Sequence, residues 1–180
     1  MIVKIEDLKK EKEFSKIDDN TLKRKLKAIE KSIRNYTNNK FINPKIRAIG
    51  KIENNTVISN LKEFLEPGDN IELTHCLNNG PYTVKNIDGN IISVEEETKL
   101  LNANRMVVTK IIYPEDIQEG VINLLKWDIG LRNKVGIKSE TISRHSITYF
   151  DMDKSNSLKG YPASLLGFLD DYIKARFWLW

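Results

Sequence analysis

The chain has 180 residues, of which 40% are hydrophobic and 30% charged, a composition suited to one globular domain or two small ones. No apolar run approaches the roughly 20 residues that a membrane-spanning helix needs, and the opening MIVKIEDLKK lacks the apolar core of a signal peptide. We therefore expect a cytoplasmic protein without a membrane partner, and the single cysteine, Cys76, excludes an internal disulfide.

The N-terminal quarter of the chain is basic and has helical periodicity. Residues 1–45 contain thirteen Lys and Arg against seven Asp and Glu, a net charge of +6, whereas residues 46–180 carry −2. We predict a short helix at 5–13 and a longer one that begins after a cap at Asp18, Asp19 or Asn20 and ends near 38–39. The apolar face of the longer helix comprises Leu22, Leu26, Ile29, Ile33 and Tyr36.

The longer helix also carries most of the basic excess. Its cations are Lys23, Arg24, Lys25, Lys27, Lys31 and Arg34. They form either a solvated helix face or a surface that contacts phosphate, as in a DNA channel, or an acidic partner. No aromatic residues interleave with the lysines, as binders of single-stranded nucleic acid usually require, which favours the solvated face.

The pattern changes between residues 43 and 112, where six short β-branched runs follow one another. Turn sequences such as Asn54-Asn55 and Asp88-Gly89-Asn90 separate them. The runs are 45–52, 54–59, 70–77, 81–87, 90–96 and 105–112. This spacing predicts a small antiparallel barrel or curled sheet with one helical interruption at 61–65, and the stretch from Gly68 to Glu96 resembles an SH3-like barrel.

The strongest helical periodicity runs from Pro114 to Val135. Pro114 suits the first helical position, acidic residues follow it, and Gly136 marks the end. The apolar residues of this helix are Ile117, Val121, Ile122, Leu124, Leu125, Trp127, Ile129 and Leu131. Because they cover so much of the circumference, the helix is either the centre of a small bundle or has a core on one side and a subunit interface on the other.

Two further elements are predicted near the C-terminus. Residues 139–149 read as a two-stranded hairpin, which is marginally stable alone. Residues 160–177 read as a closing helix whose inward-facing residues would be Leu165, Leu166, Leu169, Tyr172, Ile173 and Phe177. The aromatic segment 177–180 either folds back on its own core or binds a partner, since tryptophan is enriched at interface hot spots.

No set of residues supports catalysis or metal binding. His75 and His145 are the only histidines, and together with Cys76 they provide too few ligands for an ordinary zinc site. His75 and Cys76 are expected to alternate on a strand. The stretch DMDKSNSLKGYP imitates a calcium loop but lacks the required Gly and bidentate Glu. We predict that the protein is not an enzyme and has no cofactor.

Four segments of the chain match a known family in the same order. Residues 36–41, YTNNKF, have the Tyr-Thr-x-x-x-Phe pattern that ends its first helices, YPEDIQEGVINLLKWDIGLRNK looks like its long middle helix, and YPASLLGFLDDYIKARF looks like its closing helix. Its Ser-Glu-x-Ile-x-x-x-Ser-x-x-Tyr hairpin is matched by Ser139, Glu140, Ile142, Ser146 and Tyr149. The order of these segments resembles the head-tail connector, or adaptor, proteins of long-tailed bacteriophages.

This resemblance implies a structural protein of the virion, located at the head-tail interface and assembled in the host bacterial cytoplasm. It implies a homo-oligomeric ring of twelve copies that docks on the portal protein after DNA packaging. The ring would contact tail-proximal head-completion or tail proteins, and genomic DNA would pass through it without sequence-specific contacts. The residues in contact with the portal would be Arg176, Phe177, Trp178, Leu179 and Trp180. Those at the subunit interface would be Ser139, Glu140, Ile142, Ile147 and Tyr149.

We therefore predict an α+β fold in which a small α-helical bundle with a β-hairpin is interrupted by a small antiparallel SH3-like β-barrel. The helical connector domain would be discontinuous, 1–42 and 113–180, around an inserted barrel domain at 43–112 that compact members of the family lack. The alternative function is a small-barrel module that binds nucleic acid or a peptide on a basic helical support. Its binding would depend on Lys23, Arg24, Lys25 and Lys27 and would weaken steeply with salt.

Overall fold

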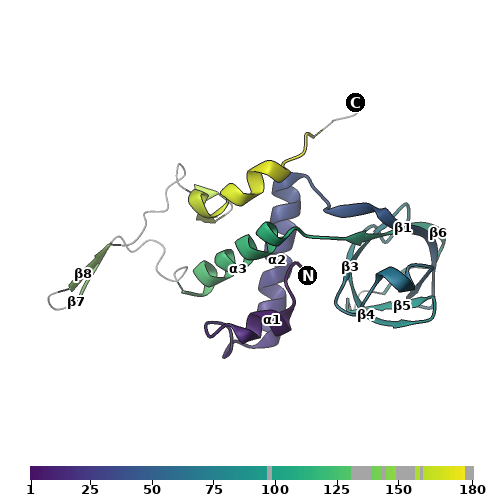
Figure 1. The fold of residues 1–180 in the computed structure, drawn as a ribbon, viewed down its shortest axis with the longest axis horizontal. Helices are drawn as coiled ribbons and strands as arrows, with labels where there is room; N and C mark the ends of the chain where they lie inside the picture. The colour runs from purple at the N-terminus through teal and green to yellow at the C-terminus, as the bar shows by residue number, and fades with distance from the viewer. Residues whose placement is uncertain (97–98, 131–138, 143–144, 149–156, 159, 177–180) are drawn as a thin grey trace. The chain divides into compact units, whose positions relative to one another are not determined.

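The computed structural model describes residues 1–96, 99–130, 139–142, 145–148, 157–158 and 160–176, with the backbone alone between 139 and 158. The chain divides into two compact units (Figure 1). Unit 1 comprises Met1 and Lys40–Tyr113, and unit 2 comprises Ile2–Asn39 and Pro114–Trp180. The fold is α+β, with a six-stranded antiparallel sheet in unit 1 and the α-helices in unit 2.

Each strand in the sheet of unit 1 has two antiparallel neighbours. The strands are β1 (Ile42–Glu53), β2 (Thr56–Ser59), β3 (Asn70–Thr74), β4 (Gly80–Asp88), β5 (Ile91–Val94) and β6 (Ala103–Ile111). Their order is β1-β2-β5-β4-β3-β6, and β6 pairs back onto β1, so the sheet closes on itself. All six predicted runs form strands, and a 3₁₀ turn at Lys62–Phe64 (η1) lies within the predicted interruption.

Two local features let the short strands close. Asn54 and Asn55, which join β1 to β2, both have positive φ, 50° and 65°, as a tight two-residue hairpin turn requires. Gly50 pairs with both Ser59 of β2 and Met106 of β6. A Cβ at Gly50 would lie 2.7 Å from the carbonyl oxygen of Ile58, so only glycine permits this close approach without a backbone shift.

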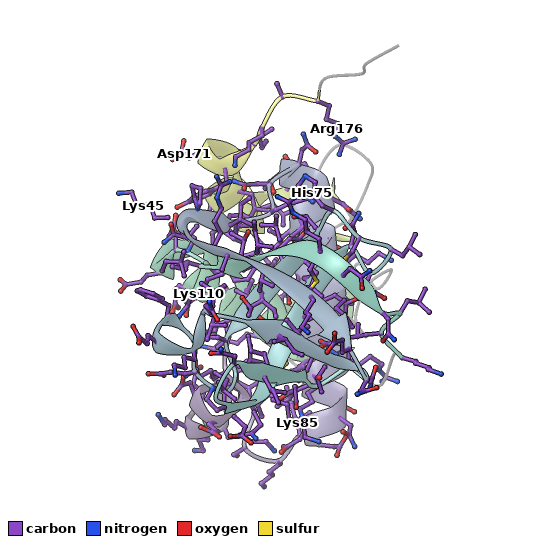
Figure 2. The ribbon with its side chains drawn as sticks, turned by 90° about the vertical axis from the view of Figure 1, so that its right-hand side faces the viewer. Lys45, His75, Lys85, Lys110, Asp171 and Arg176 are labelled. Atoms are coloured by element: carbon purple, nitrogen blue, oxygen red, sulfur yellow. The ribbon has the colours of Figure 1, made fainter. Side chains whose placement is uncertain are left out.

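The inner face of the closed sheet is a continuous apolar core. Its members are Ile52, Val57, Leu61, Leu65, Ile71, Leu73, Val84, Ile92, Leu100, Met106 and Val108. Lys110, labelled in Figure 2, supports the η1 turn because its ammonium group donates to the carbonyl oxygen of Phe64 (2.8 Å) and to Asp69 (2.7 Å). The core is thus formed both by strands joined by short turns, such as β1 and β2, and by strands far apart in sequence, such as β1 and β6.

The described residues of unit 2 form three α-helices, α1 (Ile5–Lys10), α2 (Asp19–Thr37) and α3 (Glu115–Gly130). The predicted cap of α2 is confirmed: the Asp18 side chain accepts a hydrogen bond from the amide of Thr21 (2.9 Å). The predicted end is confirmed as well, since Asn38 is left-handed with φ 49°. The buried side chains of α2 include Leu22, Leu26, Ile29 and Ile33, whereas Tyr36 is only half-buried.

Helix α3 occupies the described part of the segment predicted from 114 to 135. The apolar residues that it buries are Ile117, Val121, Leu124 and Leu125. Trp127 is half-buried, and its ring lies 5.5 Å from that of Tyr161, centroid to centroid. The predicted end of this helix, with Gly136, lies outside the described residues.

The predicted closing helix at 160–177 is wrong as an α-helix. The described chain has a short strand pair, β9 (Ser157–Leu158) with β10 (Tyr161–Pro162), and then two 3₁₀ segments, η3 (Ala163–Leu165) and η4 (Gly167–Tyr172). The amide of Leu169 bonds to the carbonyl of Leu166 (3.0 Å), three residues back. Gly167, a poor helix former, begins the second segment.

The altered geometry also changes which side chains of this segment are buried. Leu166 and Leu169 are buried as predicted, but Ile173 is 49% exposed because η4 ends at Tyr172 and Ile173 is extended. Phe168 packs over Gly120 of α3, where a Cβ would overlap the phenyl ring. Close packing on a glycine therefore holds η4 against α3.

The predicted hairpin is present in the described backbone. Strand β7 (Ser139–Ile142) pairs antiparallel with β8 (His145–Thr148), in the register Ser139 with Thr148 and Ile142 with His145. These two strands form a sheet of their own.

Candidate interaction surfaces

The segment after η4 is anchored on the C-terminal end of α2. The Lys174 amide donates to the carbonyl oxygen of Thr37 (2.7 Å), and the Asn38 side-chain amide donates to that of Ala175 (2.9 Å). The Asn39 side chain donates to the carbonyl oxygen of Tyr172 (3.3 Å). The carbonyl of Thr37, which the end of α2 leaves unpaired, is thus satisfied by an amide from far along the chain, and two asparagine side chains hold the same segment.

Side chains reinforce this anchor on two helices. The Tyr172 hydroxyl donates to both carboxylate oxygens of Asp116 on α3, each at 2.8 Å, and this hydrogen bond raises the pKa of Tyr172 above its usual value. The guanidinium of Arg176, labelled in Figure 2, donates to the carbonyl oxygen of Asn35 on α2. Arg176, one of the predicted portal contacts, is therefore held at the end of α2. The other four, Phe177, Trp178, Leu179 and Trp180, lie outside the described residues.

Of the predicted subunit-interface residues, four lie on the hairpin backbone and one does not. Ser139, Glu140 and Ile142 belong to β7, Ile147 belongs to β8, and Tyr149 falls outside the described residues. Among the described strands, β7 and β8 pair only with each other, so each has an outer edge without a paired strand. Such edges readily pair with another chain.

The six predicted cations of α2 do not share one role. Lys25 forms an ion pair with Asp128 of α3, whose side chain is 4% exposed, so this lysine ties the two helices together. Arg24, Lys27 and Lys31 are exposed, and Lys23 and Arg34 are half-buried. A second ion pair joins the ammonium of Lys126 on α3 to the carboxylate of Glu11 (2.6 Å), and this contact raises the pKa of Lys126.

Unit 1 carries a surface groove of about 500 Å³ that sequence reasoning missed. It lies across the outer face of β1, β6 and β3. The lining residues are Lys40, Ile42, Arg47, Ala48, Ile49, Glu72, Thr74, His75, Val107 and Thr109. Its apolar part is solvent-accessible, since Ile49 is 60% and Ile42 40% exposed. The one available signal was Ile49 itself, an apolar residue between Arg47 and Lys51 on the outward-facing positions of β1.

The charged side chains of the groove differ in whether they have a counterion. The Glu72 carboxylate is 2% exposed and lies 3.0 Å from the ammonium of Lys40, so this buried acid has a counterion. Arg47 is exposed, and its guanidinium group has no ion-pair or hydrogen-bond partner among the described residues. The groove therefore combines isoleucine side chains with one available positive charge.

No arrangement of catalytic or metal-binding residues emerges in the part of the chain that is described. No group of three or more His, Cys, Asp or Glu side chains there could hold a metal ion. The expectation that His75 and Cys76 alternate on a strand is wrong: β3 ends at Thr74, and His75 has φ 64°, which terminates the strand. None of the helices described is long and apolar enough to span a membrane.

Comparison of the chain with models of protein families, with curated proteins and with solved structures gave no match.

Proposed function

We propose that this chain is a structural head-tail connector of a tailed bacteriophage. It would assemble as an oligomeric ring on the portal protein after DNA packaging and join the head to the tail. In this proposal unit 2 is the helical connector domain, and the closed sheet of unit 1 is an SH3-like barrel inserted between its two halves. The order of the elements, α1, α2, α3, the β7–β8 hairpin and a closing segment, supports this assignment.

The observation that carries the proposal is the anchoring of residues 172–176. Hydrogen bonds from Asn38, Asn39, Lys174 and Arg176 hold this segment against the end of α2, and the segment immediately precedes residues 177–180 in the sequence. Pre-organising the attachment point lowers the entropy that binding costs. Tryptophan is enriched among the few residues that supply most of the affinity of a contact, so Trp178 and Trp180 suit the proposed contact with the portal.

The hairpin supplies the second argument. A two-stranded hairpin alone is marginal in water, and β7 and β8 are its only described strands. A ring with head-to-tail contacts would cover such an element in every copy and leave none uncovered once the rotation closes. We therefore assign the hairpin to the subunit interface.

The proposal is tested by mixing purified protein with purified portal and imaging the product by electron microscopy. We expect rings bound to portal, and at least tenfold weaker binding for the Trp178→Ala/Trp180→Ala variant, since hot-spot losses commonly reach about 2 kcal/mol. Phe64→Ala is the matched control, because Phe64 is 53% exposed in unit 1 and lies outside the proposed contact. Absence of any complex with portal contradicts the proposal.

The exposure of Arg24, Lys27 and Lys31 favours one second candidate, a module that binds nucleic acid through α2. This candidate predicts DNA affinity that falls steeply with salt and is lost when the three cations are replaced by Gln. The connector proposal predicts weak affinity for free DNA and an intact portal complex for the same variant. Measuring both properties on one triple variant separates the two functions.

A further inference from the structure

The groove of unit 1 has a defined chemical preference. Register pairs Ile49 of β1 with Val107 of β6 and Arg47 of β1 with Thr109 of β6. Residues two apart on a strand share a face, so Arg47 lies beside the apolar pair on the outer face of the sheet. Since Lys40 neutralises Glu72, the charge left in the groove for a ligand is that of Arg47. The complementary ligand is apolar with one carboxylate beside the apolar residues.

The β7–β8 hairpin has this composition. Register sets Glu140 opposite Ile147 and Ile142 opposite His145. Directly opposed residues of an antiparallel pair belong to the same face, so register places Glu140, Ile142, His145 and Ile147 on one face of the hairpin. A hairpin of this size also needs a surface to cover it. The groove therefore offers a surface that would cover the hairpin, and the hairpin offers a carboxylate for Arg47.

Chain length permits the hairpin to reach another molecule. Eight residues, 131–138, join α3 to β7, and eight more, 149–156, separate β8 from the last described elements. Eight residues can span at most about 28 Å when fully extended. This reach is comparable to the size of a small domain.

We propose that the hairpin of one copy docks in the unit 1 groove of a second copy, with Glu140 paired to Arg47 and the hairpin isoleucines over Ile49 and Val107. This inference rests on the proposed function, for which it names the subunit contact. The two surfaces differ, so the contact is heterologous, and its repetition generates a ring where the rotation closes, as the proposed function requires. Unit 1 is then an assembly element of the ring.

Disulfide trapping tests the contact directly. In a Cys76→Ser background, the Ile49→Cys protein is mixed with the Ile142→Cys protein under mild oxidation. We expect a covalent heterodimer from this mixture, and none when Lys85→Cys, an exposed position on β4 outside the groove (Figure 2), replaces Ile49→Cys. Equal yields from the two mixtures overturn the proposal. A second protein carries both Ile49→Cys and Ile142→Cys in the same chain. If it forms only an internal disulfide, the proposal is overturned as well, because the hairpin then docks within its own chain.

Charge reversal gives an independent test that needs no cysteine. Arg47→Glu and Glu140→Arg should each weaken self-association by about tenfold or more, as like charges are then opposed. The double variant should recover most of the loss, because the pair is restored with its sign exchanged. Sedimentation at several concentrations measures these constants. Circular dichroism confirms that each variant is folded, and failure of a folded double variant to recover overturns the proposal.

The two proposals fail in different ways. If portal recruits rings but no heterodimer is trapped, the subunit contact lies elsewhere and the connector function stands. If the heterodimer forms but portal is not bound, the contact stands and the connector function is wrong.

Discussion

The two units differ in how far each completes its own structure. In unit 1 every strand has two paired neighbours, and a single apolar core fills the sheet. In unit 2 the described strands occur only as separate two-stranded pairs, and its last segment is held by 3₁₀ turns and caps. Both units bring together residues far apart in sequence, β1 with β6 in unit 1 and α2 with residues 172–176 in unit 2. The comparison teaches that the closed sheet of unit 1 pairs all of its own strands, whereas the described hairpin of unit 2 leaves its two outer edges unpaired.

The largest expected loss of stability comes from truncating one buried side chain in the core of each unit. Ile71→Ala in unit 1 and Leu26→Ala in unit 2 each remove a fully buried side chain and should cost about 2–5 kcal/mol of unfolding free energy. If the units unfold independently, each substitution lowers the denaturant concentration at the midpoint of one unit's unfolding transition and leaves that of the other unit unchanged. All three tryptophans, at 127, 178 and 180, belong to unit 2, so tryptophan fluorescence isolates its transition in a denaturant titration. One common transition shifted equally by both variants would show that the units unfold together.

A smaller effect is expected at the contact between α3 and η4. Gly120→Ala places a methyl group against the ring of Phe168 and should cost about 1–3 kcal/mol, the usual penalty of overpacking. Gly130→Ala is the matched control on the same helix, since none of the described atoms lies within 4 Å of its added Cβ. It should be neutral or slightly stabilising, because alanine is the better helix former. Thermal unfolding followed by tryptophan fluorescence measures both, and equal stability of the two variants would argue against the packing described.

The smallest effect concerns one hydroxyl in unit 1. The buried side-chain oxygen of Ser59 has no hydrogen-bond partner among the described residues, so Ser59→Ala should stabilise the protein by up to about 1 kcal/mol. Thr56 on the same strand donates to the carbonyl oxygen of Glu53 (2.8 Å), and Thr56→Ala should instead destabilise by about 0.5–1.5 kcal/mol. Opposite signs in a urea titration are the expected result. A loss of stability in Ser59→Ala would mean that its hydroxyl is satisfied.

Local signals in the sequence predicted much of the fold. The Asp18 cap, the Asn38 terminus and the paired asparagines at 54 and 55 act over a few residues, and all three behave as their chemistry requires. The prediction of a closing helix was wrong because it followed the periodicity of the leucines and gave no weight to Gly167. The segment forms 3₁₀ turns instead, and its Phe168 packs on Gly120 of α3. Periodicity alone does not report such tertiary preferences.

The surfaces were harder to predict than the elements. The groove depends on which residues of β1, β3 and β6 become neighbours, and register between strands is not visible in a single strand's alternation. The division of the α2 cations follows from the position of Asp128, about 100 residues further along the chain. Such pairings are fixed by tertiary structure. Composition therefore indicated a basic helix but did not show that Lys25 forms an ion pair with α3.

The discontinuity of unit 2 has a consequence for synthesis at the ribosome. Helix α2 emerges early, but α3 and residues 172–176, which cover its apolar face and complete its last turn, emerge after all of unit 1. The sheet is therefore free to fold while the leucines of α2 are still uncovered. An incomplete chain would then carry a folded small domain beside a helix whose hydrophobic face is exposed, the kind of intermediate that chaperones bind.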